Sequence, residues 1–187
     1  MAELTDKQFD IAIVGAGPVG LALAAMLLRR GVSASGIVLI DAKTAEAAQQ
    51  DARSIALSYG SRQLLEQVHA WPSSGTPITE IHISRRGSFG RSLIESREYD
   101  LPALGYVCRY GQLVQTLNVA LKASGVTLLR PAKVKAVDES ADKLTLQMAD
   151  GSALDATVMV QAEGGVYGAQ SQKTLSRDYQ QSAIVAT

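Results

Sequence analysis

The apolar residues in the first part of this chain come in short runs that are separated by glycine or polar turns. Residues 9–14 and 37–41 are two such runs. Because they are largely apolar rather than alternating, they predict strands of a parallel sheet that are covered on both faces. Residues 18–30 are apolar over the length of a helix, and Gly31 is a typical helix stop. Strand, helix and strand in this order predict the first half of a doubly wound α/β fold.

The pattern changes after the second strand. Residues 42–61 are polar and rich in alanine, so we expect a connection there, followed by a helix over 62–70. A proline, two serines and a glycine then break this helix. Isoleucines amid polar residues predict a strand that starts at Ile78, with residues 92–95 as its partner.

Helical spacing returns after residue 100. Leucines that recur every four residues predict a helix over 110–123, followed by a short strand over 126–129. Residues 134–138 lead into an alternating strand over 144–148. Asp150-Gly151 is a hairpin turn signal before the strand expected over 153–160, and residues 182–187 predict a further strand.

Composition restricts the class of protein. The chain has 187 residues, 47% of them hydrophobic, and 18 basic residues balance 18 acidic ones. This balance gives no reason to expect nucleic acid as a partner. Cys108 is the single cysteine, which favours a reducing, cytoplasmic location. We expect no metal site, because the two histidines, His69 and His82, lie far apart in the sequence.

One uncharged stretch has nearly the length of a membrane span. Residues 11–28 contain three glycines and Pro18, which would break a single helix near its start. Acidic residues and a lysine precede the stretch, unlike the basic start of a signal peptide. We therefore expect neither a span nor a signal sequence here.

The most informative motif lies between the first strand and the first helix. It reads Gly15-Ala16-Gly17-Pro18-Val19-Gly20. In a dinucleotide fingerprint the first glycine allows the tight turn, the second lets the backbone approach a pyrophosphate, and the third lets helix and strand pack. Asp41 ends the second strand, where such folds bind the ribose hydroxyls. The sequence therefore predicts a dinucleotide site at the helix N-terminus.

In this order of features the chain resembles the N-terminal half of a flavin-dependent aromatic monooxygenase of the para-hydroxybenzoate hydroxylase type. It is most similar to the ubiquinone-biosynthesis hydroxylases of the 2-polyprenyl-6-methoxyphenol hydroxylase branch. The resemblance rests on the glycine motif, on Asp41, on residues 51–58 (DARSIALS) and on residues 104–107 (LGYV).

The resemblance implies FAD, with its pyrophosphate on the glycine motif and its adenosine ribose on Asp41. It also implies that Arg53 approaches the phosphate and flavin region, and that Arg109 lies near the cofactor at the start of the later helix. Asp51 is expected as a cap or turn residue. Tyr99, Tyr106 and Tyr110 could line a ring pocket, although packing is the simpler expectation.

Two features depart from the family pattern. The family's Asp-Gly pair after the returning strand is matched here by Glu163-Gly164, with Tyr167 in the position of a serine. Family members are also much longer, and their third motif, a Gly-Asp pair, has no match. We therefore expect the FAD-binding part of a longer enzyme, with its C-terminal half missing and no activity by itself.

The implied fold is α/β, a Rossmann-like FAD-binding domain with an inserted, incomplete β-rich portion of a substrate domain. The expected bounds are 1–75 for the FAD-binding core, 76–100 for the β segment of the substrate domain, 101–170 for the return to the FAD-binding domain, and 171–187 for the start of the truncated substrate domain.

The implied reaction is hydroxylation of a phenolic ring in ubiquinone biosynthesis. NAD(P)H would reduce the FAD, and O₂ would be the co-substrate. A polyprenyl-phenol substrate implies peripheral contact with the inner membrane or with a quinone-synthesis complex. Two alternatives stay open. The first is an NAD-binding reductase domain, against which the long detour through residues 78–160 counts. The second is a non-catalytic nucleotide-binding module, which the altered Glu163 region would allow.

Overall fold

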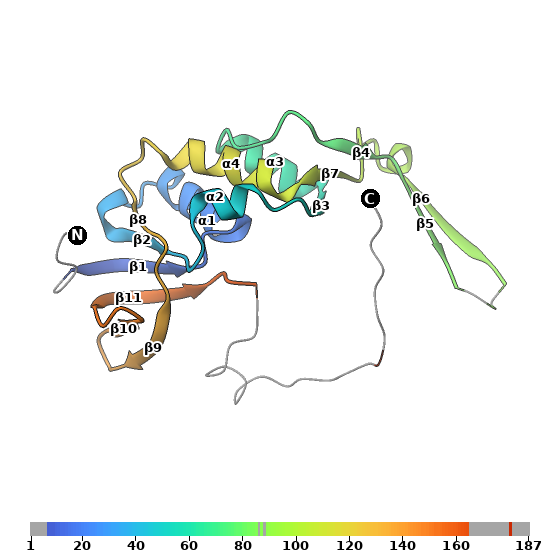
Figure 1. Ribbon diagram of the computed structural model, residues 1–187. Helices are drawn as coiled ribbons and strands as arrows, with labels where there is room; N and C mark the ends of the chain where they lie inside the picture. Colours follow the sequence, from blue (N-terminus) through green and yellow to red (C-terminus); the bar gives the residue numbers. More distant parts are fainter. Residues whose placement is uncertain (1–6, 86, 88, 165–179, 181–187) are drawn as a thin grey trace.

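A six-stranded sheet carries the fold in the computed structural model, which describes residues 7–85, 87, 89–164 and 180 (Figure 1). The strand order is β8-β2-β1-β11-β10-β9. β1 pairs in parallel with β2 and β11, β2 pairs in parallel with β8, and β10 pairs antiparallel with β9 and β11. The bounds are β1 (Gln8–Val14), β2 (Ile37–Ile40), β8 (Thr127–Leu129), β9 (Val134–Glu139), β10 (Leu144–Met148) and β11 (Ala153–Gln161).

The central strands are buried on both faces, which explains their apolar runs. Ile13 and Leu39 belong to the core beneath α1 (Pro18–Arg29) and α4 (Tyr110–Leu121). Val14 and Ile40 face the other way and pack with residues of the β10–β11 hairpin, such as Leu146. The parallel strands, the first helix and the hairpin expected from the sequence are therefore confirmed.

The connection predicted over residues 42–61 is wrong, because it contains regular structure. The helix α2 (Ala45–Gln49) begins after Thr44, whose hydroxyl accepts a hydrogen bond from the Ala47 N–H at 3.2 Å. The strand β3 (Ser54–Ser58) follows, and α3 (Tyr59–Gln67) begins directly after it. These elements are short and half exposed, so they carry little hydrophobic periodicity.

A second sheet forms beside the helices. Its order is β3-β7-β4, with β7 (Gly105–Arg109) antiparallel to both β3 and β4 (Thr76–Ile78). Tyr106 of β7 is buried, and its ring lies edge-on to Trp71 with the centroids 5.3 Å apart. Its role in the core is therefore packing.

A separate hairpin projects from this part of the molecule (Figure 1). It consists of β5 (Glu80–Ser84) and β6 (Arg91–Glu95), followed by the 3-10 turn η2 (Ser96–Tyr99). A second 3-10 turn, η1 (Ala34–Gly36), precedes β2. The strand expected over residues 182–187 lies outside the described residues.

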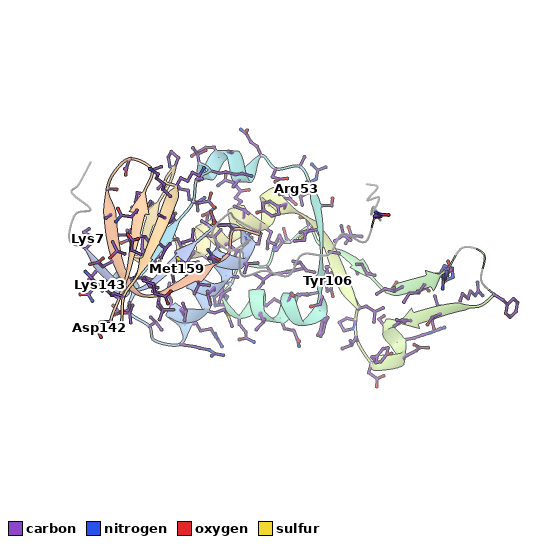
Figure 2. All side chains as sticks on the ribbon, turned by 90° about the horizontal axis from the view of Figure 1, so that it is seen from below. Lys7, Arg53, Tyr106, Asp142, Lys143 and Met159 are labelled. Carbon is purple, nitrogen blue, oxygen red and sulfur yellow. The ribbon has the colours of Figure 1, made fainter. Side chains whose placement is uncertain are left out.

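The two ends of the main sheet differ. At the amino end of β1, Lys143, which directly precedes β10 and is labelled in Figure 2, forms an ion pair of 2.5 Å with Asp155 of β11. At the carboxyl end, the strands lead into the glycine motif and Asp41. None of the described helices is long and apolar enough to cross a membrane.

Candidate functional site

The turn between β1 and α1 can be built only with glycine at its first position. Gly15 has a φ of +108°, a backbone conformation that residues other than glycine rarely adopt. A Cβ there would lie 2.5 Å from the Ala162 carbonyl carbon and 2.7 Å from the Glu163 nitrogen. The turn therefore packs against the chain that leaves β11.

The other two glycines serve different purposes. A Cβ on Gly20 would overlap the carbonyl oxygen of Gly15, so its absence lets α1 pack on the turn. Gly17 is the N-cap of α1, and no side chain caps this helix. Pro18 follows, and the first turn contains no acidic residue. The first N–H groups of α1 have no partner within the helix, which is the arrangement that binds anions.

Asp41 connects the ends of β1 and β2. One carboxylate oxygen accepts a hydrogen bond from the Ala16 N–H at 2.7 Å, and the other accepts one from the Lys43 N–H at 2.7 Å. Each oxygen keeps lone pairs for further donors. Asp41 can thus accept hydrogen bonds from the hydroxyl groups of a ligand next to the glycine motif.

These groups line one cleft of about 320 Å³. Most of the residues expected from the sequence line it, namely Gly15, Ala16, Gly17, Pro18, Val19, Asp41, Glu163 and Gly164. The cleft is also lined by Ala42, Lys43, Ala48, Asp51, Ile55, Tyr110 and Ala162. The sequence indicates Tyr110 only as a residue that could line a ring pocket and Asp51 as a cap or turn residue, and it gives no signal for the others. Gly20 lies behind the turn, where it contacts Gly15.

The residues 51–53 lie at the margin of the cleft. The Arg53 guanidinium binds both carboxylate oxygens of Asp51, with distances of 2.6 to 3.1 Å, and its side chain is 70% exposed (Figure 2). Its carbon Cζ lies 4.9 Å from the centroid of the Tyr110 ring. The hydrogen bonds from Arg53 hold the pKa of Asp51 at about 2. Arg53 is thus paired beside the cleft rather than among the residues that line it.

The start of α4 brings Tyr110, rather than Arg109, into the cleft. Arg109 is exposed at the end of β7, opposite Ser54, and its side chain makes no hydrogen bond or ion pair within the described part of the chain. Cys108 of β7 is buried, and Tyr110, the first residue of α4, is partly buried and packs against the same core cluster.

Most of the charged side chains that line the cleft are acidic, namely Asp41, Asp51 and Glu163. Burial and the nearby charge of Asp41 raise the pKa of Glu163, while Lys133 opposes this shift. Burial also raises the pKa of Tyr110, so its hydroxyl keeps its proton at neutral pH. Lys43 is the one cation among the residues that line the described cleft. Beside Lys43, an anionic ligand would therefore depend on backbone N–H groups and neutral donors.

A smaller hollow of about 240 Å³ adjoins the cleft at Ala42, the residue after Asp41. It shares Ala42 with the cleft and is otherwise lined by residues of the β8–β9 and β10–β11 connections, namely Pro131, Ala132, Lys133, Met148, Ala149 and Asp150. The Ala132 N–H donates to the Asp41 carbonyl at 2.8 Å and fixes this wall.

The described residues offer no metal centre, since they contain no group of three or more His, Cys, Asp or Glu side chains that could hold an ion. A glycine turn at a helix N-terminus, a carboxylate at the end of the neighbouring parallel strand and the cleft between them define a dinucleotide-binding α/β protein.

Comparison with known families gives the particular class. The chain belongs to the family described as the FAD binding domain, whose profile matches residues 8–178. It is 32% identical over 166 residues to a ubiquinone hydroxylase, UbiL, of Rhodospirillum rubrum, a match that covers 85% of this chain and 38% of the relative. It is 30% identical over 168 residues to the 3-demethoxyubiquinol 3-hydroxylase of Escherichia coli, covering 86% of this chain and 42% of the relative. The chain thus spans about two fifths of the length of these relatives.

The fold is also similar to that of a solved monooxygenase structure. The p-nitrophenol 4-monooxygenase PnpA of Pseudomonas putida superposes with a TM-score of 0.71 at 17% identity, covering 92% of this chain and 45% of that one. The Rossmann-like FAD-binding fold expected from the sequence is therefore confirmed.

Proposed function

We propose that the cleft at the N-terminus of α1 binds FAD, and that the chain is the FAD-binding part of an enzyme that hydroxylates a phenolic ring. The observation that carries the proposal is the glycine motif, in which any side chain on Gly15 would collide with Ala162 and Glu163. Such a turn brings backbone, rather than side chains, next to a ligand.

The residues of the cleft fit the parts of FAD. The uncapped N-terminus of α1 suits the pyrophosphate, since it presents N–H groups and a partial positive charge. Asp41 suits the adenosine ribose, and the hollow beside it suits the adenine. Glu163 and Gly164 line the same cleft and take the place of the family's Asp-Gly pair.

Bound FAD supplies the redox and oxygen chemistry, for which we propose NAD(P)H as electron donor and O₂ as co-substrate. This chain's residues hold and orient the cofactor. No residue of the chain is assigned as catalytic. The first turn of α1 would hold the pyrophosphate in the middle of the cofactor, and Asp41 would hold the adenosine ribose next to it.

The relatives named as ubiquinone hydroxylases support a phenol with a polyprenyl tail as the substrate class. For such a substrate we propose a cytoplasmic protein with peripheral contact to the inner membrane or to a quinone-synthesis complex. We also propose that the hairpin β5–β6 belongs to the substrate domain within residues 76–100. Its Ile81 and Ile83 side chains are 40% and 54% exposed, which is consistent with a partner strand or sheet elsewhere in a longer enzyme.

Cofactor binding is tested by titrating the purified, ligand-free protein with FAD, NAD and NADP under the same conditions. The proposal predicts a complex with FAD that has the visible flavin absorption bands, and weak or no binding of NAD. The variant Lys143→Ala, at the opposite end of the sheet, should bind FAD as the parent does. A protein that binds NAD but not FAD would favour the reductase alternative, and one that binds neither would favour a module without cofactor.

The reaction class is tested in cells that lack the gene. A prenylated phenol one hydroxyl group short of its normal product should accumulate, as detected by mass spectrometry of the lipid extract. An unchanged quinone profile would contradict the proposed substrate class while leaving FAD binding in place.

A further inference from the structure

Tyr110 is the one residue at the start of α4 that turns into the cleft, and its backbone is tightly fixed. Its N–H donates to the Arg53 carbonyl at 2.8 Å, and the next N–H, of Gly111, donates to the Asp51 carbonyl at 3.2 Å. A Cβ on Gly111 would overlap the Gln49 carbonyl oxygen. The start of α4 is therefore held against residues 49–53 without room for a side chain between them.

The ring of Tyr110 is held as firmly as its backbone. The Arg53 guanidinium lies over one face, 4.9 Å from the ring centroid, and Asp51 holds that guanidinium with both oxygens. At the far end of the ring, the hydroxyl oxygen would lie 2.9 Å from a Cβ on Gly17. The hydroxyl thus stands at the N-cap of α1, where the free N–H groups open into the cleft.

This hydroxyl has no hydrogen-bond partner of its own within the described residues. The phenol is half buried, and burial holds its pKa above the ordinary value, so it remains a donor at neutral pH. The carboxylates that line the cleft, Asp41, Asp51 and Glu163, can only accept hydrogen bonds when they are ionised. A fixed, unpaired donor next to the helix N-terminus is suited to an anionic ligand.

We propose that the Tyr110 hydroxyl donates a hydrogen bond to the pyrophosphate of the cofactor and so fixes its position on α1. The inference rests on the proposed binding of FAD and adds a binding residue to it. The ion pair of Asp51 and Arg53 positions the Tyr110 ring, and the Tyr110 hydroxyl, rather than Arg53, contacts the phosphate. This assigns to Tyr110 the contact with the phosphates that the family resemblance implied for Arg53.

The test compares the protein with its Tyr110→Phe variant, which keeps the ring and its contact with Arg53 but loses the hydroxyl. The probes are FAD, ADP and adenosine, with dissociation constants measured by calorimetry. A lost hydrogen bond to a charged group should weaken the binding of FAD and ADP about tenfold. Adenosine has no phosphate, so its affinity should not change. Tyr99→Phe is the matched control, since Tyr99 is 58% exposed on η2, and it should bind all three ligands as the parent does.

The outcomes separate this inference from the proposed function. If the parent binds FAD and Tyr110→Phe binds it equally well, the role of Tyr110 is refuted while FAD binding stands. If the variant loses adenosine as strongly as FAD, the hydroxyl supports the fold of the cleft and does not contact the phosphates. If the parent protein itself does not bind FAD or ADP, both proposals fail. Thermal unfolding of the ligand-free proteins should coincide, because the hydroxyl has no partner to lose.

Discussion

Replacing the glycines of the β1–α1 turn by alanine should have different effects at different positions: Gly15→Ala should mainly lower stability, and Gly17→Ala should mainly weaken cofactor binding. Gly15→Ala introduces a Cβ that lies 2.5 to 2.7 Å from backbone atoms of Ala162 and Glu163, at a φ of +108°. Backbone cannot move aside as a side chain can, so the overlap should cost about 1–3 kcal/mol. The positive φ should add about 1–2 kcal/mol. The total, about 2–5 kcal/mol, is a large part of the stability of an ordinary domain.

Gly17→Ala should behave differently. Gly17 has a φ of −78°, and its Cβ would meet only the tip of the Tyr110 side chain, at 2.9 Å. Its cost in stability should be below about 1 kcal/mol. The methyl group would, however, stand where the pyrophosphate approaches the backbone and would push the Tyr110 hydroxyl away. FAD affinity should therefore fall at least about tenfold, since this glycine is the one that admits the phosphates.

Thermal unfolding of the ligand-free proteins and FAD titration measure the two effects. For a chain of this size, about 2–5 kcal/mol lowers the Tm by about 5–20 °C. Gly31→Ala is the matched control, because Gly31 has a φ of +87° but nothing within 4 Å of its Cβ. It should show the conformational cost alone and keep FAD affinity. The reasoning is refuted if Gly15→Ala unfolds no earlier than Gly31→Ala, or if Gly17→Ala binds FAD like the parent.

Three further substitutions test the electrostatics of the site. Asp41→Ala removes the acceptor of two backbone N–H groups, those of Ala16 and Lys43, so the unfolding free energy should fall by about 1–3 kcal/mol and FAD affinity should fall with it; unchanged urea unfolding would contradict this. Glu163→Gln should raise the Tm at pH 7 and leave it unchanged near pH 4. The raised pKa of Glu163 means that the fold disfavours its ionised carboxylate, and this penalty is absent once the carboxyl is protonated. A lower Tm of the variant at pH 7 would contradict this prediction. Asp51→Asn should lower stability above about pH 5, and most of this effect should be lost as the pH falls to about 2, since the depressed pKa of about 2 makes Asp51 stabilising only while it is ionised. Urea unfolding across this range measures the difference, and a pH-independent difference would count against the ion pair as its cause.

The core of the fold could be predicted from the sequence because each of its elements is specified by residues within the same short segment. The buried strands β1 and β2 need apolar residues on both faces, and the turn between β1 and α1 needs glycine where the backbone has a positive φ or a close neighbour. The hairpin at Asp150-Gly151 is also a local signal, and the structure confirms it between β10 and β11.

The second sheet could not be predicted in the same way. The strand β3 is held mainly by its pairing with β7, some fifty residues later, as between Ser54 and Arg109. Such a pairing leaves little pattern in either segment. The prediction of the candidate site was incomplete for the same reason. Tyr110 reaches the cleft because Gly111 allows close packing on Gln49 and Asp51, and the spacing of residues along the chain does not reveal these contacts.

The N-terminus of α1 should hold the pyrophosphate of FAD, and a crystal structure of the protein grown with FAD would show whether it does. We expect density for both phosphates against the backbone of residues 15–18, with the ribose on Asp41 and the Tyr110 hydroxyl within hydrogen-bond distance of a phosphate oxygen. Density for the cofactor elsewhere, or a glycine turn closed by protein side chains in the presence of excess FAD, would contradict it.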